Sequence, residues 1–393
     1  MNTLDLLEDA KNFHSELINW RRHLHENPEP SLEEYQTSKF VQDRLNEMGF
    51  ANIVQMARTG VVAMVEGQEK GETVALRADM DALRMADEKT TEYKSKNLGI
   101  THACGHDGHT SMLLGAAKLL KKHPPRKGSI KLIFQPAEEG QFGAKKMIDE
   151  GVLKNPTVKA IAALHVNPDV PTGYFTCSAN EACAASDSFE IEIIGQGGHA
   201  GHPDKAKDAI TIAAEVITSL QQLISREIDP VSPTVMTVAN IQGGTVNNAI
   251  AGIVRMAGTV RTLDSEIRET IDDKMERIIK GITEAFDAKF SFHYTRLYPP
   301  LLNARSLVTS VEKTVKETLG EERFQISKPS TGAEDFAFYT NEVPGVYFRL
   351  GVRNELKDAV YPLHHPKFDL DEEALPYGSA ILAQWALNQL ENN

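Results

Sequence analysis

Apolar segments of strand length alternate with amphipathic segments of helix length through the first 166 residues of this chain. Strands that alternate with helices favour a largely parallel sheet with helices covering its faces. The pattern therefore predicts an α/β fold for this part of the chain. We expect a helical start up to about residue 48, strands at 61–65, 73–78, 130–134 and 159–166, and helices at 109–122 and 143–150.

The helical start contains two boundary signals. Pro28 and Pro30 separate one predicted helix from the next, because proline interrupts the hydrogen bonding of a helix interior. Ser31 and Glu34 match the capping box, in which a hydroxyl and a carboxylate satisfy free backbone N–H groups of the first helical turn. We therefore expect the second of these helices to begin with Ser31 as its cap.

The order of the elements changes near residue 185, where β-α-β-β-α-β replaces simple alternation. That order is ferredoxin-like and makes a complete small domain. Its elements are expected at 188–194, 206–226, 235–241, 254–262, 265–286 and 290–294. From about residue 298 a strand at 346–350 and a closing helix at 371–390 return to the first domain. We predict a discontinuous domain of residues 1–184 and 298–393, with an inserted domain of residues 185–297.

Length and charge narrow the class of protein. A chain of 393 residues exceeds the usual size of a single core, which agrees with two domains. The 55 acidic and 42 basic residues give a net charge of −13, which argues against nucleic acid or an anionic membrane as partner. No run reaches the roughly 18 apolar residues of a membrane span. The first residues are acidic, where a signal peptide would be basic, and three cysteines are too few to suggest a disulfide framework. A reducing, cytoplasmic location is therefore expected.

Potential metal ligands follow three of the predicted strands. Asp79 and Asp81 come after the strand at 73–78, Glu138 and Glu139 after the strand at 130–134, and His165 ends the strand at 159–166. In an open α/β sheet, ligands bind beyond the carboxyl ends of the strands. Three strands that deliver carboxylate or imidazole groups to one edge indicate a site there.

Cys104 and His106 stand two residues apart at the start of a predicted helix. Both can reach one ion if the backbone bends, which Gly105 permits, and a helix N-terminus favours a thiolate. A buried cysteine beside a capping turn explains the same residues equally well. His109, one turn further on, is expected to pack on the helix or to support a ligand.

Each of the other candidate site residues can also be explained without a function. Adjacent acids such as Glu138 and Glu139 are usually solvated, although in hydrolysis one could bind metal while the other accepts a proton. His165, alone in an apolar run, is more often a satisfied core residue. His364, in a late loop, is more often merely exposed.

A glycine-rich segment follows the first strand of the inserted domain. Residues 195–200 formally match a dinucleotide-binding fingerprint. Pro203 and a polar stretch come before the next helix, and an acidic residue at the end of a second strand is missing, so we reject this interpretation. A loop that presents His199 into a cleft explains the segment better.

Eight motifs occur in the order of a known family and span nearly the whole chain. They are RRHLHENP at 21–28, RADMDAL at 77–83, HACGHD at 102–107, QPAEEG at 135–140, LHV at 164–166, GGH at 197–199, AEDF at 333–336 and HHPKF at 364–368. The chain resembles the metal-dependent amidohydrolases that comprise aminoacylases, hippurate hydrolases and auxin-conjugate hydrolases. These belong to the zinc-peptidase superfamily of glutamate carboxypeptidase and acetylornithine deacetylase.

The resemblance implies a metallopeptidase-like catalytic domain and an inserted lid and dimerisation domain. It implies five ligands for two divalent metal ions, namely Cys104, His106, Glu139, His165 and His364. Glu138 would be the general base and later the proton donor. His199 would stabilise the oxyanion, in the active site of the other subunit. Asn248 and Arg261 would hold the polar end of the substrate, and Asp81 would orient a ligand; Asp79 stands where more distant relatives carry a ligating histidine.

The implied activity is hydrolysis of the amide bond of N-acyl amino acids by a homodimer or homotetramer. Thiolate, imidazole and carboxylate ligands together suit manganese or zinc, with cobalt or nickel as alternatives, better than magnesium or calcium. The chain departs from the family pattern at Arg84, where proline is usual, and at Ala249 and Ala251, where the motif has valine and proline.

Two alternative functions remain open. The same metals and base would serve an aminopeptidase or dipeptidase of the superfamily. A non-catalytic protein that binds metal or a small molecule is a different class, and such a protein has no need of Glu138 or His199.

Overall fold

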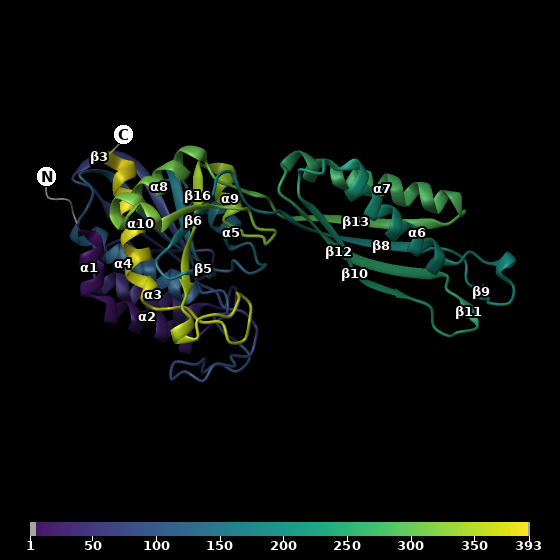
Figure 1. Cartoon of the computed structure of the whole chain (residues 1–393), viewed down its shortest axis with the longest axis horizontal. Helices are drawn as coiled ribbons and strands as arrows, with labels where there is room; N and C mark the ends of the chain where they lie inside the picture. The colour runs from purple at the N-terminus through teal and green to yellow at the C-terminus, as the bar shows by residue number, and fades with distance from the viewer. Residues whose placement is uncertain (1–4, 392–393) are drawn as a thin grey trace. The chain divides into compact units, whose positions relative to one another are not determined.

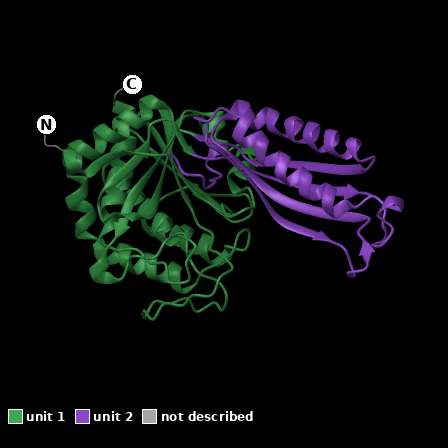
Figure 2. Cartoon of the chain, turned by 45° about the vertical axis from the view of Figure 1, so that its right-hand side comes forward, with its two compact units in different colours: residues 1–182, 302–328, 338–393 green, residues 183–301, 329–337 purple. Residues whose placement is uncertain are grey.

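The computed structural model describes residues 5–391, which form two compact units (Figures 1 and 2). Unit 1 consists of Met1–Ala182, Leu302–Lys328 and Phe338–Asn393, and unit 2 of Cys183–Leu301 and Pro329–Ala337. The short second segment of unit 2 lies within the part of the chain that the sequence pattern assigns to the returning first domain. Short strands β7 (Glu181–Cys183) and β14 (Leu301–Leu302) pair where the chain passes between the units.

Unit 1 is built on an eight-stranded sheet in the described part of the chain, in the order β1-β2-β4-β3-β5-β16-β6-β15. The central strands β4, β3, β5 and β16 run parallel, whereas β1, β2 and β6 pair antiparallel with a neighbour. This confirms the predicted mostly parallel α/β class. The strands are β1 Val54–Met56, β2 Gly60–Glu66, β3 Glu69–Asp79, β4 Lys127–Gln135, β5 Val158–Pro171, β6 Phe175–Ser178, β15 Phe324–Ser327 and β16 Gly345–Arg353.

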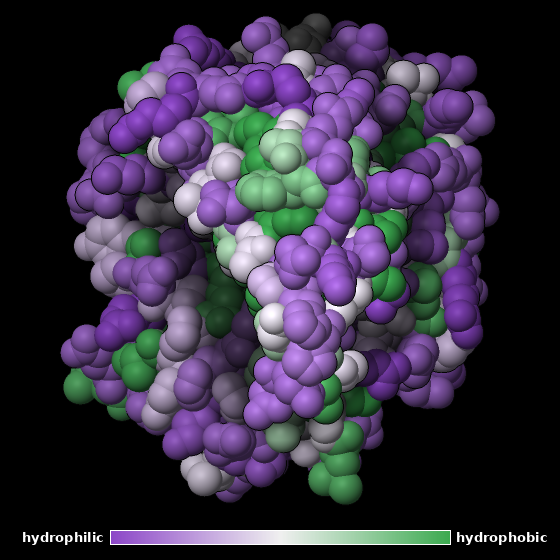
Figure 3. Space-filling model, turned by 90° about the vertical axis from the view of Figure 1, so that its right-hand side faces the viewer, coloured by the Kyte–Doolittle hydropathy of each residue, from purple (hydrophilic) through white to green (hydrophobic). Residues whose placement is uncertain are grey.

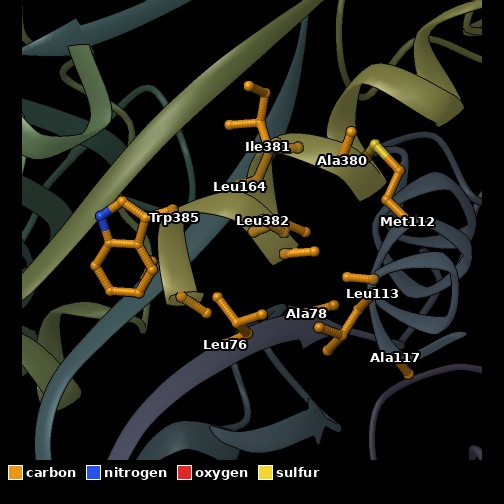
Figure 4. Close-up of a cluster of buried hydrophobic side chains, with 14 of the residues drawn as sticks. Leu76, Ala78, Met112, Leu113, Ala117, Leu164, Ala380, Ile381, Leu382 and Trp385 are labelled. Carbon is orange, nitrogen blue, oxygen red and sulfur yellow. The ribbon is translucent and has the colours of Figure 1, made fainter. Parts of the chain in front are cut away.

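Two long helices supply much of the core of unit 1. In α4 and α10 most side chains are buried, as expected for helices that pack into a core on more than one side. Figure 4 shows Met112 and Leu113 of α4 and Leu382 of α10 packed with Leu76 and Leu164 of the sheet. The helices are α1 Leu6–Asn12, α2 His14–Glu26, α3 Tyr35–Glu47, α4 His106–Lys122, α5 Gly143–Asp149, α8 Arg305–Leu319, α9 Ala337–Glu342 and α10 Ala374–Glu391.

None of the helices within residues 5–391 combines the length and the apolar character needed to cross a lipid bilayer.

The predicted capping box at Ser31 is wrong. Helix α3 begins at Tyr35, and the side chain of its N-cap residue, Glu34, makes no capping hydrogen bond. Ser31 Oγ instead donates to Asp81 Oδ2 over 2.7 Å. Glu34 is fully buried and accepts hydrogen bonds from Ala137 N and Thr59 Oγ1. The side chains of Ser31 and Glu34 therefore bind residues distant in sequence instead of capping the helix.

Unit 2 has the predicted β-α-β-β-α-β order. Its four-stranded antiparallel sheet runs β10-β12-β8-β13, so the first and third strands of the unit lie in the centre. Helix α6 begins at Ala209, where the Asp208 side chain caps it by accepting from Ile210 N. The elements are β8 Ser186–Ile194, β9 Gly198–His199, α6 Ala209–Gln222, β10 Thr234–Gly243, β11 Ala249–Ile250, β12 Ile253–Thr262, α7 Ser265–Ala285 and β13 Lys289–Tyr298.

Helices α4 and α10 approach each other closely through two glycines. A Cβ atom on Gly115 would lie 2.2 Å from Ser379 Oγ, and a Cβ atom on Gly378 would lie 2.0 Å from Met112 Sδ. These distances are far inside van der Waals contact, so a larger side chain would force the two helices apart. Close packing at this crossing therefore requires glycine.

We predict opposite effects for the same substitution at two helical glycines. Gly115→Ala should lower the free energy of unfolding by about 1–3 kcal/mol, because the added methyl group overpacks the contact with α10. Gly281→Ala in α7 has open space around its Cβ position and should raise that free energy by about 0.5–1 kcal/mol. Denaturant unfolding of both variants measures the difference, and equal shifts would contradict the packing argument.

Candidate active site and metal centre

Three parallel strands bring predicted ligands together in the unit 1 sheet. Strand β3 ends at Asp79, and β4 leads into the turn with Glu138. The prediction that His165 ends its strand is wrong, because β5 continues past His165 to Pro171. Helix α4 starts three residues earlier than predicted, at His106. Gly105 adopts a left-handed φ of 82°, and a Cβ atom there would lie 2.4 Å from Val166 Cγ2. Glycine therefore lets Cys104 and His106 turn toward the same place.

The five predicted ligands come together in overlapping groups. Ligand atoms lie within 4.8 Å of one another in the group Cys104, His106 and His165 and in the group Cys104, Glu139 and His364. Cys104 Sγ lies 3.5 Å from His165 Nε2, and His364 Nε2 lies 3.2 Å from Glu139 Oε1. A further group joins His106 to Glu138 and Glu139. Groups that share Cys104, His106 and Glu139 suit two neighbouring ions.

Two imidazoles are oriented by backbone carbonyls. His106 Nδ1 lies 2.8 Å from the Asp81 carbonyl oxygen, and His165 Nδ1 lies 2.7 Å from that of Val166. A carbonyl oxygen can only accept, so Nδ1 carries a proton in both rings, and Nε2 is the nitrogen that can bind a metal once it carries no proton. His106 Nε2 is buried and has no hydrogen-bond partner among residues 5–391. A buried nitrogen without a partner is unfavourable in free energy, and a divalent ion bound to Nε2 would remove this penalty. The residues therefore fit a metal.

Asp79 and His109 support this centre. Their atoms fall in a group with His106, yet His109 Nδ1 bonds Asp79 Oδ1 over 2.6 Å and His109 Nε2 accepts from Val166 N. Both ring nitrogens of His109 are thus engaged. Asp79 Oδ2 also accepts from Arg77 over 2.7 Å. The two residues therefore pack beneath the ligands, as expected for His109.

Arg84, where the resembling family usually has proline, lies at the surface. Its side chain is two-thirds exposed (67%) and forms an ion pair of 2.7 Å with Glu33.

The pKa values of the proposed ligands are shifted in different directions by burial and by neighbouring groups. Burial, and then the charge of Glu139, raise the pKa of the Cys104 thiol. Burial, with the neighbouring His109, lowers the pKa of His165 well below its usual value. Hydrogen bonds with Cys104 and Glu139 raise the pKa of His364 to about 10. Although burial lowers the pKa of His106, the charges of Asp79 and Cys104 raise it well above its usual value. A metal must therefore displace protons from Cys104, His106 and His364, while His165 is already a neutral ligand.

The turn that carries Glu138 and Glu139 is held by two buried carboxylates. Glu34 Oε1 accepts from Ala137 N over 2.8 Å, and Asp81 accepts from Glu138 N and Glu139 N over 3.0 Å each. Three successive N–H groups are thus fixed, although Ala137 has an unfavourable φ of 58°. Burial and the nearby Asp81 charge raise the pKa of Glu34 to about 7. Sequence reasoning missed this role because only burial distinguishes Glu34 from a surface acid.

Unit 2 places His199 and Asn248 together. His199 in β9 pairs with Ala249 in β11, and Ala200 N donates to the Asn248 carbonyl over 3.0 Å. Gly201 N donates to His199 Nδ1 over 3.0 Å, so the proton of the neutral ring lies on the exposed Nε2. Arg261 does not lie beside these two residues within unit 2. Strand β12 starts at Ile253, shortly after β11, and Arg261 is eight residues further on, about 26 Å along the strand.

We predict that Glu34→Ala lowers kcat for the amide hydrolysis that the motif resemblance implies by about 10-fold to 100-fold, because the turn at Ala137 loses a buried acceptor. Glu34→Gln keeps an acceptor oxygen in the same place and should retain most of the activity. Steady-state kinetics of the two variants tests this, with the metal content of each determined in parallel. Full activity in Glu34→Ala would show that Asp81 alone holds the turn.

Comparison with known proteins agrees with this site. The profile of peptidase family M20/M25/M40 matches residues 75–388. The chain is 40% identical to "IAA-amino acid hydrolase ILR1-like 4" of Arabidopsis thaliana over 98% of its length and 88% of the relative. It is 38% identical to "N-acetyl-L-cysteine deacetylase" of Bacillus subtilis over 96% and 89% of the two chains.

A solved structure shares the fold at comparable identity. This Bacillus subtilis protein, YXEP, is described as a dinuclear metal binding peptidase from the M20 family. It superposes with a TM-score of 0.86 at 34% identity and covers 98% of this chain and 100% of its own. The family resemblance expected from the motifs is thereby confirmed. This chain belongs to peptidase family M20/M25/M40.

Proposed function

We propose that this chain hydrolyses the amide bond of N-acyl amino acids, with two divalent metal ions and with Glu138 as the general base. The observation that carries the proposal is the pairing of Glu138 with the ligand group of His106 and Glu139, in a turn fixed by Asp81. The relatives named for N-acetyl-L-cysteine deacetylation and IAA-amino acid hydrolysis support an acylated amino acid as substrate.

The ligands support two divalent ions per subunit. Cys104, His106, Glu139, His165 and His364 would hold them, which makes the set a mixture of thiolate, imidazole and carboxylate. Such a set favours manganese or zinc, with cobalt or nickel as alternatives. Bound divalent metal polarises a carbonyl oxygen and activates water for attack at neutral pH.

The protein's own groups divide the remaining work. Glu138 accepts the proton of the attacking water and returns it to the departing amine nitrogen. The exposed Nε2–H of His199 donates a hydrogen bond to the oxyanion, a contribution of about 3–4 kcal/mol for single donors in other enzymes. Asn248 and Arg261 bind the polar end of the substrate.

The proposed assembly is a homodimer or homotetramer formed through unit 2. Strand β10 is an edge strand of its sheet, and edge strands readily pair with another chain. Exposed apolar side chains near this edge include Ile210, Ile241 and Val246. Figure 3 shows apolar side chains gathered within a largely hydrophilic face.

The acidic composition and the free cysteines support a cytoplasmic protein without a nucleic-acid partner.

A dipeptidase or exopeptidase activity is the second candidate. It is favoured by 39% identity to "Thermostable carboxypeptidase 2" of Saccharolobus solfataricus over 98% of this chain and 99% of the relative. Acetyl, benzoyl, succinyl and indole-acetyl amino acids should be assayed against free-amine dipeptides with manganese, zinc or cobalt added. Preference for the acyl compounds is expected. Turnover of dipeptides alone would favour the second candidate, and no turnover of any amide would favour a non-catalytic binding protein.

We predict that Glu138→Ala retains two metal ions but loses activity by about 10²-fold to 10⁴-fold, since general acid–base catalysis is removed. Cys104→Ala should instead lose metal together with activity. Elemental analysis combined with the hydrolysis assay separates these two outcomes. Near-normal turnover by Glu138→Ala would overturn the base assignment.

We predict that mixed oligomers of two inactive variants recover activity. If His199 acts in the active site of the neighbouring subunit, a hybrid of His199→Ala and Glu138→Ala subunits contains one site with both groups intact. Subunit exchange followed by the hydrolysis assay should restore up to about half of the wild-type activity per hybrid dimer, a ceiling that follows from one restored site in two. A hybrid shown to form but still inactive would place His199 in its own subunit.

A further inference from the structure

A buried arginine outside the ligand cluster meets three carboxylates from distant parts of the chain. Arg21 of α2 is fully buried. Its Nε lies 2.8 Å from Asp107 Oδ2, its Nη2 lies 2.5 Å from Asp369 Oδ1, and its Nη1 lies 3.4 Å from Glu372 Oε1. Each of the three guanidinium nitrogens therefore bonds a different acidic residue.

Two of these carboxylates belong to segments that carry metal ligands. Asp107 directly follows His106, and its Oδ1 accepts from Gly108 N over 2.9 Å within the first turn of α4. Asp369 lies in the segment that follows His364, and its Oδ1 accepts from Leu370 N over 2.9 Å. The same guanidinium thus joins the segment of His106 to that of His364.

A third segment enters the same network. His25, one turn after Arg21 in α2, bonds Asp107 Oδ2 through Nδ1 at 2.6 Å and reaches Asp87 Oδ2 at 3.3 Å. Asp87 accepts from Ser95 N over 3.0 Å, in the segment that leads to Cys104. Helix α2 is therefore connected to all the chain segments that deliver Cys104, His106 and His364.

We propose that Arg21 is a positioning residue that sets the distance between the Cys104–His106 segment and the loop of His364, and thereby the affinity for metal. The proposal rests on the proposed metal-dependent function. A planar guanidinium with donors in a fixed fork can meet three carboxylates at once, whereas a lysine ammonium cannot reproduce that geometry. Side chains behind the ligands commonly change metal affinity by about 10-fold to 100-fold.

Unit 2 offers a matched control. Arg268 is also buried and forms two hydrogen bonds with Asp187, of 2.9 Å and 2.8 Å, in a unit that contains none of the five proposed metal ligands. Arg21→Lys and Arg268→Lys therefore both break hydrogen bonds between a buried guanidinium and carboxylate, to three acidic residues at Arg21 and to one at Arg268. Both substitutions should lower the melting temperature of the metal-free protein.

The test is the affinity of the full-length protein for Zn²⁺, measured by competition with a chromophoric chelator. Arg21→Lys should bind Zn²⁺ at least about 10-fold more weakly, whereas Arg268→Lys should match the wild type. The rise in melting temperature on adding Zn²⁺ should shrink only in Arg21→Lys. The visible absorption spectrum of the Co²⁺-loaded protein should change in Arg21→Lys alone, because the ligand geometry differs.

The outcomes separate this proposal from the proposed function. Wild-type protein that binds no metal would refute the metal-dependent function itself. Two metals in the wild type with unchanged affinity in Arg21→Lys would refute only the positioning role. If Arg21→Lys does not fold, Asp369→Asn carries the test, because it weakens one contact of Arg21 and should also reduce Zn²⁺ affinity. Unchanged affinity in Asp369→Asn would then overturn the proposal.

Discussion

The site depends on the hydrogen bonds of one buried residue, Asp81. Its carboxylate accepts from the backbone N–H groups of Glu138 and Glu139 and from Ser31 Oγ, and its carbonyl oxygen accepts from His106 Nδ1. Burial alone would raise the pKa of Asp81, but the contact and the charge of the His106 side chain, together with the hydrogen bonds from Ser31 and Glu139 N, lower it below its ordinary value. An ionised carboxylate that cannot donate a proton fixes which groups around it must donate. Asp81 therefore sets the orientation of a proposed base and two proposed ligands together.

The sequence predicted the parts of the site that depend on periodicity. The strands at 73–78, 130–134 and 159–166 lie within β3, β4 and β5, although β5 continues past His165 to Pro171, so that only Asp79 and Glu138 lie at or just beyond a strand end. The burial and the tertiary contacts of a single residue leave no periodic pattern in the sequence. Glu34 matched a capping pattern because the motif is local, while its actual partner, Ala137 N, lies 103 residues away. The network of Arg21 escaped sequence reasoning for the same reason.

The proposed function assigns metal binding and hydrolysis to different residues of this centre. Cys104 and His165 lie 3.5 Å apart and are explained completely by a metal, so a protein that only stores or senses metal could contain them. Glu138 is different, because it stands beside the proposed ligand Glu139 in a turn with three successive N–H groups engaged by buried carboxylates. Holding a second carboxylate there adds charge repulsion to the site. That cost is expected where proton transfer is required.

Buried ion pairs such as those of Arg21 are weak arguments for stability. Desolvation of the guanidinium and of Asp107 and Asp369 offsets most of the Coulomb attraction, so an apolar cluster of similar volume would hold α2 about as well. What an apolar cluster lacks is directionality, since it permits small sliding motions of α4 against the loop of His364. Hydrogen bonds of fixed length and angle resist such sliding. A metal centre assembled from segments so far apart in sequence needs that resistance more than it needs the free energy.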